Sequence, residues 1–373
     1  MKLCIITSNV GKGDGQARVN YEIVKAAIQR RHNVTLVATQ VAPDLKDNEF
    51  IDWVYLSVKN MPIGLMREIV FTQQSDSWLQ RHHHKFDVVM ACGAVTSKKT
   101  DVNVVHFVHS TWLKSPFHTS RVNKNLYGAY HWLYTSFNSY WEKQAFKKAK
   151  TLIAVSETIK QELISVGIAE EKIEVVLNGV DLNEFSPLVL GRKQFGLPDK
   201  VDLALFVGDF RTNRKNLDTV LKALVSVPNL HLAVVGNAEK SPYPQLAKQL
   251  KVDKRVHFLG YRSDVAKIMQ AVDFFVFPSR YEPFGMVVTE AMASGLPVIT
   301  TAVSGVAAVI TPECGIVLSD SEDIQALTDA LVSLTSNSEL RIQMGQAARA
   351  IAEQHSWESK ANDYIDLFER LGA

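Results

Sequence analysis

The feature that most constrains the fold is an alternation of short apolar runs with longer segments of helical period along the chain. The expected strands of the first series are residues 2–8, 34–38, 87–91, 104–108 and 151–155, and residues 16–31 are expected to be helical. A second series begins with the expected strand 202–207 and continues with 230–235, 273–277 and 297–300. Strands that alternate with helices in this way are typical of parallel α/β sheets. The sequence therefore predicts two such sheets in succession.

The two series are separated by residues 178–198, which are rich in Gly, Pro, Asn and Asp and show little periodicity. A chain of 373 residues is too long for one ordinary core, so two domains are expected. We predict an N-terminal Rossmann-like domain over residues 1–180, a linker over 181–198, a second Rossmann-like domain over 199–355, and a helix over 356–373. Ligands of such sheets bind beyond the carboxyl ends of the strands.

Composition and charge exclude several classes of protein. A formal net charge of +2 gives no indication of a nucleic-acid partner. The longest apolar stretches fall short of the roughly 20 residues of a membrane-spanning helix, and the run after Met1 is too short for a signal peptide. The three cysteines are far apart and suggest reduced thiols, with Cys4 and Cys92 in the core. A cytoplasmic protein is expected.

The most informative segment of the chain contains two glutamates and has the sequence FPSRYEPFGMVVTEAMASGLPV over residues 277–298. Glu282 lies in the loop, and Glu290 lies near the start of a helix expected over 286–295. Gly285 directly precedes this helix, whose free backbone N–H groups suit a diphosphate, and a glycine lets the phosphate approach closely. An isolated pair of acids at this spacing is more often a loop acid and a helix-start acid without function. The flanking residues favour a functional site.

This segment closely resembles the signature of glycosyltransferase family 4, including its paired glutamates at Glu282 and Glu290. Four weaker markers follow the order of that family: Gly11–Gly15, residues 154–157, residues 178–181 with Phe185 and Pro187, and residues 214–216. The resemblance covers essentially the whole chain. It implies the α/β fold called GT-B, in which two Rossmann-like domains face each other across a cleft and the last helix crosses back to the first domain. It also implies a nucleotide-diphosphate sugar as donor, retention of anomeric configuration, and no bound metal or other cofactor.

The resemblance assigns roles to residues of this loop and helix. Glu282 matches the glutamate that contacts hydroxyls of the donor sugar, and Glu290 matches the one that accepts both hydroxyls of a ribose. Backbone amides near the helix start would hold the diphosphate, so the implied donor site also includes Phe284, Gly285, Met286 and Val287.

Two cations, Arg214 and Lys215, follow the strand expected to end near Val207. Cations aimed at a leaving diphosphate would stabilise its growing negative charge, and each charge-assisted hydrogen bond contributes about 1.5–3 kcal/mol. The alternative is a solvated pair at the start of a surface helix. The position after a strand favours the phosphate role, with Lys215 the stronger candidate.

Two departures from the family pattern concern the same region. Members often carry Arg immediately after the glycine that matches Gly208, whereas this chain has Asp209. Arg211 is expected to reach into that space and to contact the donor. Ala308 stands where the family commonly has glutamate. Asp209 and Ala308 together motivate the alternative of a non-catalytic binding protein.

In the first domain, Gly13 and Gly15 belong to a glycine-rich loop before a helix, and the resemblance implies that this loop lies near the donor diphosphate. His109 matches a family histidine near the reaction centre, so the implied catalytic residues are Glu282, His109 and Lys215. His106 lies three residues earlier, and we expect it to reach the same site only if the strand has already ended.

The acceptor is not identified by any motif. Residues 121–150 carry six Lys or Arg against one acid, Glu142, with eight aromatic residues interleaved. Such a segment is able to lie on an anionic membrane surface as a peripheral contact. The alternative, slightly favoured, is that the aromatic residues pack under the sheet while the lysines coat the surface.

A metal site is not expected. The chain contains no Asp-x-Asp pair, and the tract His82–His84 lies in a polar segment without a partner acid or cysteine, where a solvated surface is favoured. We therefore predict a retaining, metal-independent transferase that moves a hexose-type sugar from a nucleotide-diphosphate sugar to a glycan, lipid or small-molecule hydroxyl. The alternatives are another GT-B enzyme, such as a sugar-nucleotide epimerase or a phosphorylase, and a non-catalytic nucleotide-sugar-binding protein.

Overall fold

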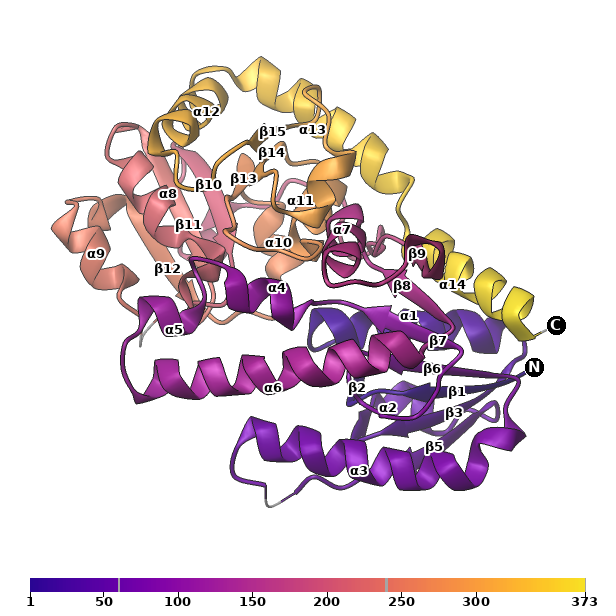
Figure 1. Cartoon of the computed structure of the whole chain (residues 1–373). Coiled ribbons are helices and arrows are strands. Elements are labelled where there is room, and N and C mark those ends of the chain that lie inside the picture. Colours follow the sequence, from indigo (N-terminus) through magenta and orange to yellow (C-terminus); the bar gives the residue numbers. More distant parts are fainter. Residues whose placement is uncertain (60, 239–240, 373) are drawn as a thin grey trace. The chain divides into compact units, whose positions relative to one another are not determined.

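Two all-parallel β-sheets carry the architecture, one in each of two units (Figure 1). The computed structural model describes residues 1–59, 61–238 and 241–372. The first unit comprises Met1–Gly179 together with Trp357–Ala373, and the second comprises Val180–Ser356. The prediction of two parallel α/β sheets is confirmed. Residues 181–198, expected as a linker, group with the second unit.

The first unit contains a seven-stranded sheet of order β5-β3-β1-β6-β7-β8-β9. Its strands are β1 (Lys2–Ile6), β3 (Asn33–Ala38), β5 (Ile51–Tyr55), β6 (Val88–Cys92), β7 (Val102–Val105), β8 (Thr151–Ala154) and β9 (Ile173–Val175), with a separate pair β2 (Asn9–Val10) and β4 (Gln40–Val41). Its helices are α1 (Gly15–Gln29), α2 (Pro43–Lys46), α3 (Gly64–His82), α4 (His109–Lys114), α5 (Thr119–Val122), α6 (Leu126–Lys148), α7 (Glu157–Ser165) and α14 (Trp357–Gly372), with 3-10 turns η1 (His83–Lys85) and η2 (Glu170–Lys172).

The second unit contains a six-stranded sheet of order β12-β11-β10-β13-β14-β15. Its strands are β10 (Asp202–Val207), β11 (Leu230–Val235), β12 (Val256–Gly260), β13 (Phe274–Phe277), β14 (Val298–Thr301) and β15 (Gly315–Leu318). Its helices are α8 (Leu217–Leu224), α9 (Tyr243–Gln249), α10 (Val265–Met269), α11 (Met286–Ala293), α12 (Ile324–Ser336) and α13 (Ser338–Glu353), with 3-10 turns η3 (Arg192–Phe195), η4 (Asn213–Lys215), η5 (Asp253–Arg255) and η6 (Gly305–Val309).

The core of the first unit lies on both faces of its sheet, because successive residues of a strand point to opposite sides. On one face, Cys4 and Val89 pack against Phe71 of α3. Cys4, Cys92 and Cys314 are all buried free thiols, so the core placement predicted for Cys4 and Cys92 is confirmed. The opposite face is covered near Val88 by the end of α14, where a Cβ added to Gly372 would lie 3.2 Å from the Val88 side chain.

The C-terminal helix α14 completes the first unit (Figure 1). It packs on α1 and buries Tyr364 and Phe368 entirely, and each such side chain contributes about 1.5–3 kcal/mol through burial. Arg30, just after α1, donates to Asp366 (2.5 Å) and to Glu369 (3.1 Å). The chain passes between the units twice, after Gly179 and after Ser356.

None of the helices in the described residues is long and apolar enough to cross a membrane.

Candidate active site

The loop between β13 and α11 is held in one conformation by backbone contacts within the second unit. The N–H of Gly305 donates to the carbonyl of Glu282 (2.9 Å), and the N–H of Val306 donates to that of Phe284 (2.7 Å). Gly285 has φ +104°, where a side chain is strained, and an added Cβ would lie 3.2 Å from Val306. The glycine therefore suits both the turn and its close packing.

Gly285 is the N-cap of α11, and the helix begins at Met286. The first N–H groups of a helix have no intrahelical acceptor, so those of Met286 and Val287 are available to an anion. Glu290 is the fifth residue of α11 and is partly exposed, one turn beyond the helix start. Phe284 is buried beneath the loop.

A buried ion pair joins two of the predicted catalytic residues. The Nζ of Lys215, on η4, donates to a carboxylate oxygen of Glu282, and the two side chains are only 14% and 11% exposed. Burial lowers the pKa of Lys215, against the opposing effect of the Glu282 charge. Burial alone would raise the pKa of Glu282, but the charges of Lys215 and Arg214 hold it below its usual value. Glu282 is therefore ionised at neutral pH.

The ammonium of Lys215 also lies over the ring of Phe277, 4.9 Å from its centroid. An ammonium has three N–H donors, and Glu282 occupies one of them. The arrangement fixes a cation at the carboxyl end of β13, where it is able to donate to a further anion.

Two residues to which the sequence analysis assigned no role hold this loop in place. The side chain of Asn216 is buried and donates to the carbonyls of Pro278 (2.9 Å) and Ser321 (2.7 Å). Asn216 itself has φ +66°, in the left-handed region that asparagine tolerates. Arg280 forms bidentate pairs with Asp218 and Glu322 and donates to the carbonyl of Asn213 (2.9 Å). These contacts join the Lys215 segment to the Glu282 segment.

Arg211 lies near this region but is folded onto Asp209. Its Nε lies 2.8 Å from Oδ2 of Asp209, and both side chains are exposed. The arginine thus neutralises the acid that departs from the family pattern. Ala308, the second departure, is exposed on η6.

The glycine-rich loop of the first unit is exposed. A Cβ added to Gly13 would meet no atom within 4 Å. Gly15 is the first residue of α1, and Asp14 caps that helix by accepting from the N–H of Ala17 (2.9 Å). The Asp14 carboxylate therefore already occupies one of the N–H groups at the start of α1.

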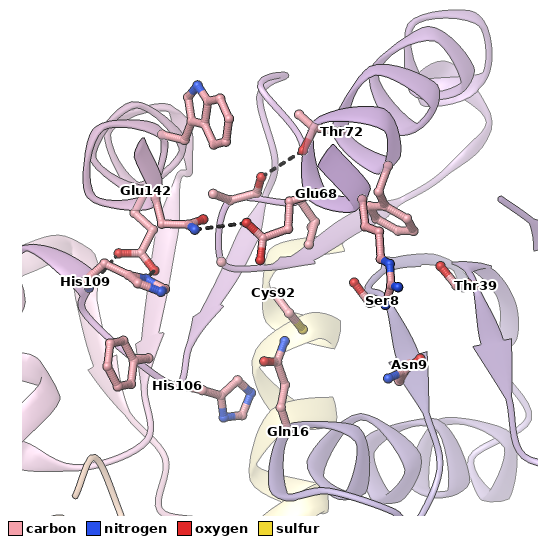
Figure 2. Close-up of a pocket in the computed structure, with 18 of the residues that line it drawn as sticks. Ser8, Asn9, Gln16, Thr39, Glu68, Thr72, Cys92, His106, His109 and Glu142 are labelled. Atoms are coloured by element: carbon pink, nitrogen blue, oxygen red, sulfur yellow. Dashed lines mark hydrogen bonds and ion pairs between the residues drawn. The ribbon is translucent and has the colours of Figure 1, made fainter. Parts of the chain in front are cut away.

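A cavity of about 450 Å³ lies beside this loop in the first unit, lined by residues of β6, β7, α3, α4 and α6. His109 begins α4 and is one of its lining residues. Its Nδ1 lies 2.6 Å from Oε1 of Glu142, and its backbone N–H donates to Oε2 (2.9 Å). Figure 2 shows the two side chains together on one wall.

The contact with Glu142 sets both the orientation and the charge of His109. A carboxylate accepts only, so Nδ1 carries the proton and Nε2 is left for a ligand. Burial alone would lower the pKa of His109, but the charges of Glu142 and Glu68 raise it above its usual value. Glu68 is itself fixed by the hydroxyl of Tyr134 and by the side-chain amide of Asn138 (2.9 Å).

His106 also lines this cavity, because β7 ends at Val105 and the chain has left the strand by residue 106. Burial lowers its pKa to about 4, so it is neutral.

No local motif in the sequence marks Glu142 and Glu68, since they lie 33 and 41 positions from His109. The one signal was that Glu142 is the sole acid of a basic segment.

No group of three or more His, Cys, Asp or Glu side chains suited to a metal ion occurs among the described residues. His82, in the predicted surface tract, stacks on Trp78 and bonds to its carbonyl (2.8 Å).

The two parallel sheets with helices between their strands define a protein of the doubly wound α/β class. Residues 191–351 match the model of "Glycosyl transferases group 1", and residues 13–184 match that of "Glycosyltransferase Family 4". The chain belongs to this family of GT-B glycosyltransferases, so the predicted family and fold class are confirmed.

Three similar proteins illustrate the relationship. A D-inositol 3-phosphate glycosyltransferase of Corynebacterium kroppenstedtii is 32% identical over 61% of this chain and 55% of its own length. The lipopolysaccharide glucosyltransferase WaaG of Escherichia coli is 36% identical over 47% of this chain and 49% of its own length. The structure of an Anabaena protein in complex with UDP-glucose has a TM-score of 0.71 at 19% identity, over 99% of this chain and 100% of that chain. The chain thus spans about half the length of these two curated relatives.

Proposed function

We propose that the protein transfers a hexose-type sugar from a nucleotide-diphosphate sugar to an acceptor hydroxyl, with retention of anomeric configuration. The single observation that carries this proposal is the buried Lys215–Glu282 pair beside the start of α11. A carboxylate that holds sugar hydroxyls and a cation that meets a leaving phosphate are the two charges this reaction needs.

In this proposal the diphosphate of the donor binds at the N–H groups of Met286 and Val287, and Glu290 accepts the ribose hydroxyls. Phe284 and Gly285 shape the loop, and the exposed Gly13 and Gly15 leave room for a diphosphate at the first unit. Arg214 adds positive charge on the approach to the site, while Arg211 offsets the charge of Asp209.

The proposed reaction breaks the bond between the anomeric carbon and the diphosphate oxygen. The acceptor oxygen bonds to the same carbon from the same face, and its proton passes to an oxygen of the leaving diphosphate. Lys215 and Arg214 stabilise the negative charge that grows on this group. No side-chain nucleophile is involved, and the protein's own cations serve where other transferases use a metal.

A donor panel tests the proposal. The pure protein is incubated with UDP-, GDP-, ADP- and dTDP-sugars in EDTA, and nucleotide release is measured with and without simple sugar acceptors. Release from one donor that persists in EDTA is the expected result. Failure of every donor both to bind and to be cleaved would favour a non-catalytic protein, and a product of inverted configuration would refute retention.

We also propose that His109 takes part in the reaction as a cation, so Glu142→Gln is expected to move the alkaline limb of the pH profile of kcat/KM to lower pH. The reason is that the pKa of His109, which the Glu142 charge raises, falls when that charge is removed. The His109–Glu142 pair makes its full contribution to stability at pH values below the unfolded histidine pKa of about 6.5. This contribution is lost as the pH rises through the raised pKa of His109 in the folded protein. The stability lost in the variant should therefore shrink with rising pH.

The pH profile and urea unfolding at several pH values are the measurements for this variant, with the exposed acid Glu171→Gln as control. An unshifted pH profile would show that His109 does not act as a cation in the reaction.

A further inference from the structure

Along its middle, helix α6 buries polar side chains and exposes apolar ones. Thr135, Asn138 and Glu142 are buried, at spacings of three and four residues that place them on one face. Away from this buried face, α6 carries exposed apolar residues: Leu126 (91% exposed), Trp132 (54%), Leu133 (43%), Phe137 (42%) and Tyr140 (62%). We call these five residues the outer face of α6. The favoured expectation that the aromatic residues of this segment pack under the sheet is wrong for this face.

The outer face is long and continuous. Leu126, Leu133, Phe137 and Tyr140 follow one another at intervals of seven, four and three residues, which align along a helix. At a rise of 1.5 Å per residue they extend over about 21 Å. The start of α3 packs against α6, since a Cβ added to Gly64 would lie 3.6 Å from the Tyr130 hydroxyl. Ile63 and Met66, at this start of α3, are exposed.

Positive charge flanks the outer face at both ends. Arg121 and Lys124 precede the helix, Lys143 and Lys147 lie in its last turns, and all four are exposed. The only acid of residues 121–150, Glu142, is buried against His109. The exposed surface of this segment therefore carries charge of one sign.

We propose that the outer face of α6 docks on an anionic lipid bilayer. Exposed Trp, Tyr and Leu side chains enter the headgroup region, while the four cations meet anionic headgroups. A second copy of the chain fits this surface less well, because a self-contact would bring its like charges together.

Docking in this way would place the cavity next to the bilayer. The inward side of the same helix lines the cavity through Tyr134, Asn138, Trp141 and Glu142, and a helix with its side chains is about 10 Å across. We infer that the acceptor hydroxyl is carried on a membrane lipid. This second step rests on the proposed sugar transfer, whereas docking itself does not.

Vesicle flotation of the full chain tests the docking. The vesicles contain either phosphatidylcholine alone or phosphatidylcholine with 30% phosphatidylserine, a composition chosen for the test at about physiological salt. The protein is expected to float with the anionic vesicles only. Leu133→Ser/Phe137→Ser should reduce binding at least about tenfold, and Lys143→Glu/Lys147→Glu should reduce it about 30-fold or more. The control Tyr261→Ser/Ile342→Ser changes two exposed apolar residues of the second unit and should float normally.

Circular dichroism first establishes that each variant is folded. The proposal is overturned if the unmodified protein does not float. It is also overturned if neither Leu133→Ser/Phe137→Ser nor Lys143→Glu/Lys147→Glu reduces flotation. A monomer–dimer change in light scattering that the same substitutions abolish, without lipid binding, would assign the surface to protein contact instead.

Nucleotide release without vesicles separates the two proposals. Turnover of a donor with a soluble acceptor but no flotation would refute docking and leave sugar transfer standing. Flotation without turnover or binding of any donor would refute sugar transfer and leave docking standing.

Discussion

Lys215→Ala is expected to lower kcat for sugar transfer by about 100- to 1,000-fold, the effect of removing one donor that stabilises charge in a transition state. The loss should appear in kcat more than in KM, because the negative charge on the diphosphate grows as its bond to the sugar breaks. The variant also leaves Glu282 buried without the cation that holds its pKa down. Steady-state kinetics with the donor found in the panel measure the effect.

Lys222→Ala is the matched control for this experiment. Lys222 lies on α8, is 42% exposed and pairs only at 3.6 Å with Asp218, so its removal should leave kcat nearly unchanged. Thermal unfolding distinguishes a catalytic from a folding defect. A fall of less than tenfold in kcat for a folded Lys215→Ala would remove this lysine from the proposed chemistry.

Arg280→Met is expected to destabilise the second unit by about 3 kcal/mol, because breaking a buried ion pair leaves its acids uncompensated. Arg280 is only 4% exposed. Asp218 and Glu322 are 21% and 41% exposed, so water partly solvates their charges once Arg280 is gone. The expected loss of stability is therefore at the low end of the range for broken buried ion pairs.

The positions of the tryptophans allow unfolding of the two units to be distinguished. All six tryptophans of the chain fall in the first unit, at positions 53, 78, 112, 132, 141 and 357. Arg280→Met should therefore shift the urea midpoint measured by circular dichroism more than the midpoint measured by tryptophan fluorescence. The partly exposed pair Arg262–Asp264 provides the control, since Arg262→Met should leave the free energy of unfolding nearly unchanged. A loss below 1 kcal/mol for Arg280→Met would show that the network does not stabilise the unit.

The strands that could be predicted from the sequence are the interior strands of both sheets. Strands such as β6 and β13 are buried along their whole length and appear as continuous apolar runs. Within the two large sheets, the strands of the described residues that we did not predict are β5, β9, β12 and β15, which form the sheet edges. The short separate pair β2 and β4 was not predicted either. β5, β9 and β12 are partly exposed and mix polar and apolar residues, so they do not stand out from loops. β15 is apolar but only four residues long, which is too short for a clear pattern.

In the site, too, the features set by neighbouring residues could be predicted from the sequence, whereas those set by distant partners could not. The loop around Glu282 and Gly285 and the start of α11 follow from residues adjacent in the chain. Arg280 and Glu142 take their roles from partners 33 to 62 positions away, which no local pattern marks. Helix α6 adds a further reason, because apolar residues occur on several of its sides and periodicity cannot tell which side faces inward.

The return of α14 to the first unit has a consequence for synthesis of the chain. Residues 180–356 form one contiguous unit inserted between the two parts of the other. On the ribosome, the inserted unit has all its residues available first, whereas the sheet that begins at Lys2 waits for Tyr364 and Phe368 to cover it. The part of the protein made first is thus the last to be completed, and its exposed apolar face is a natural target for chaperones during that interval.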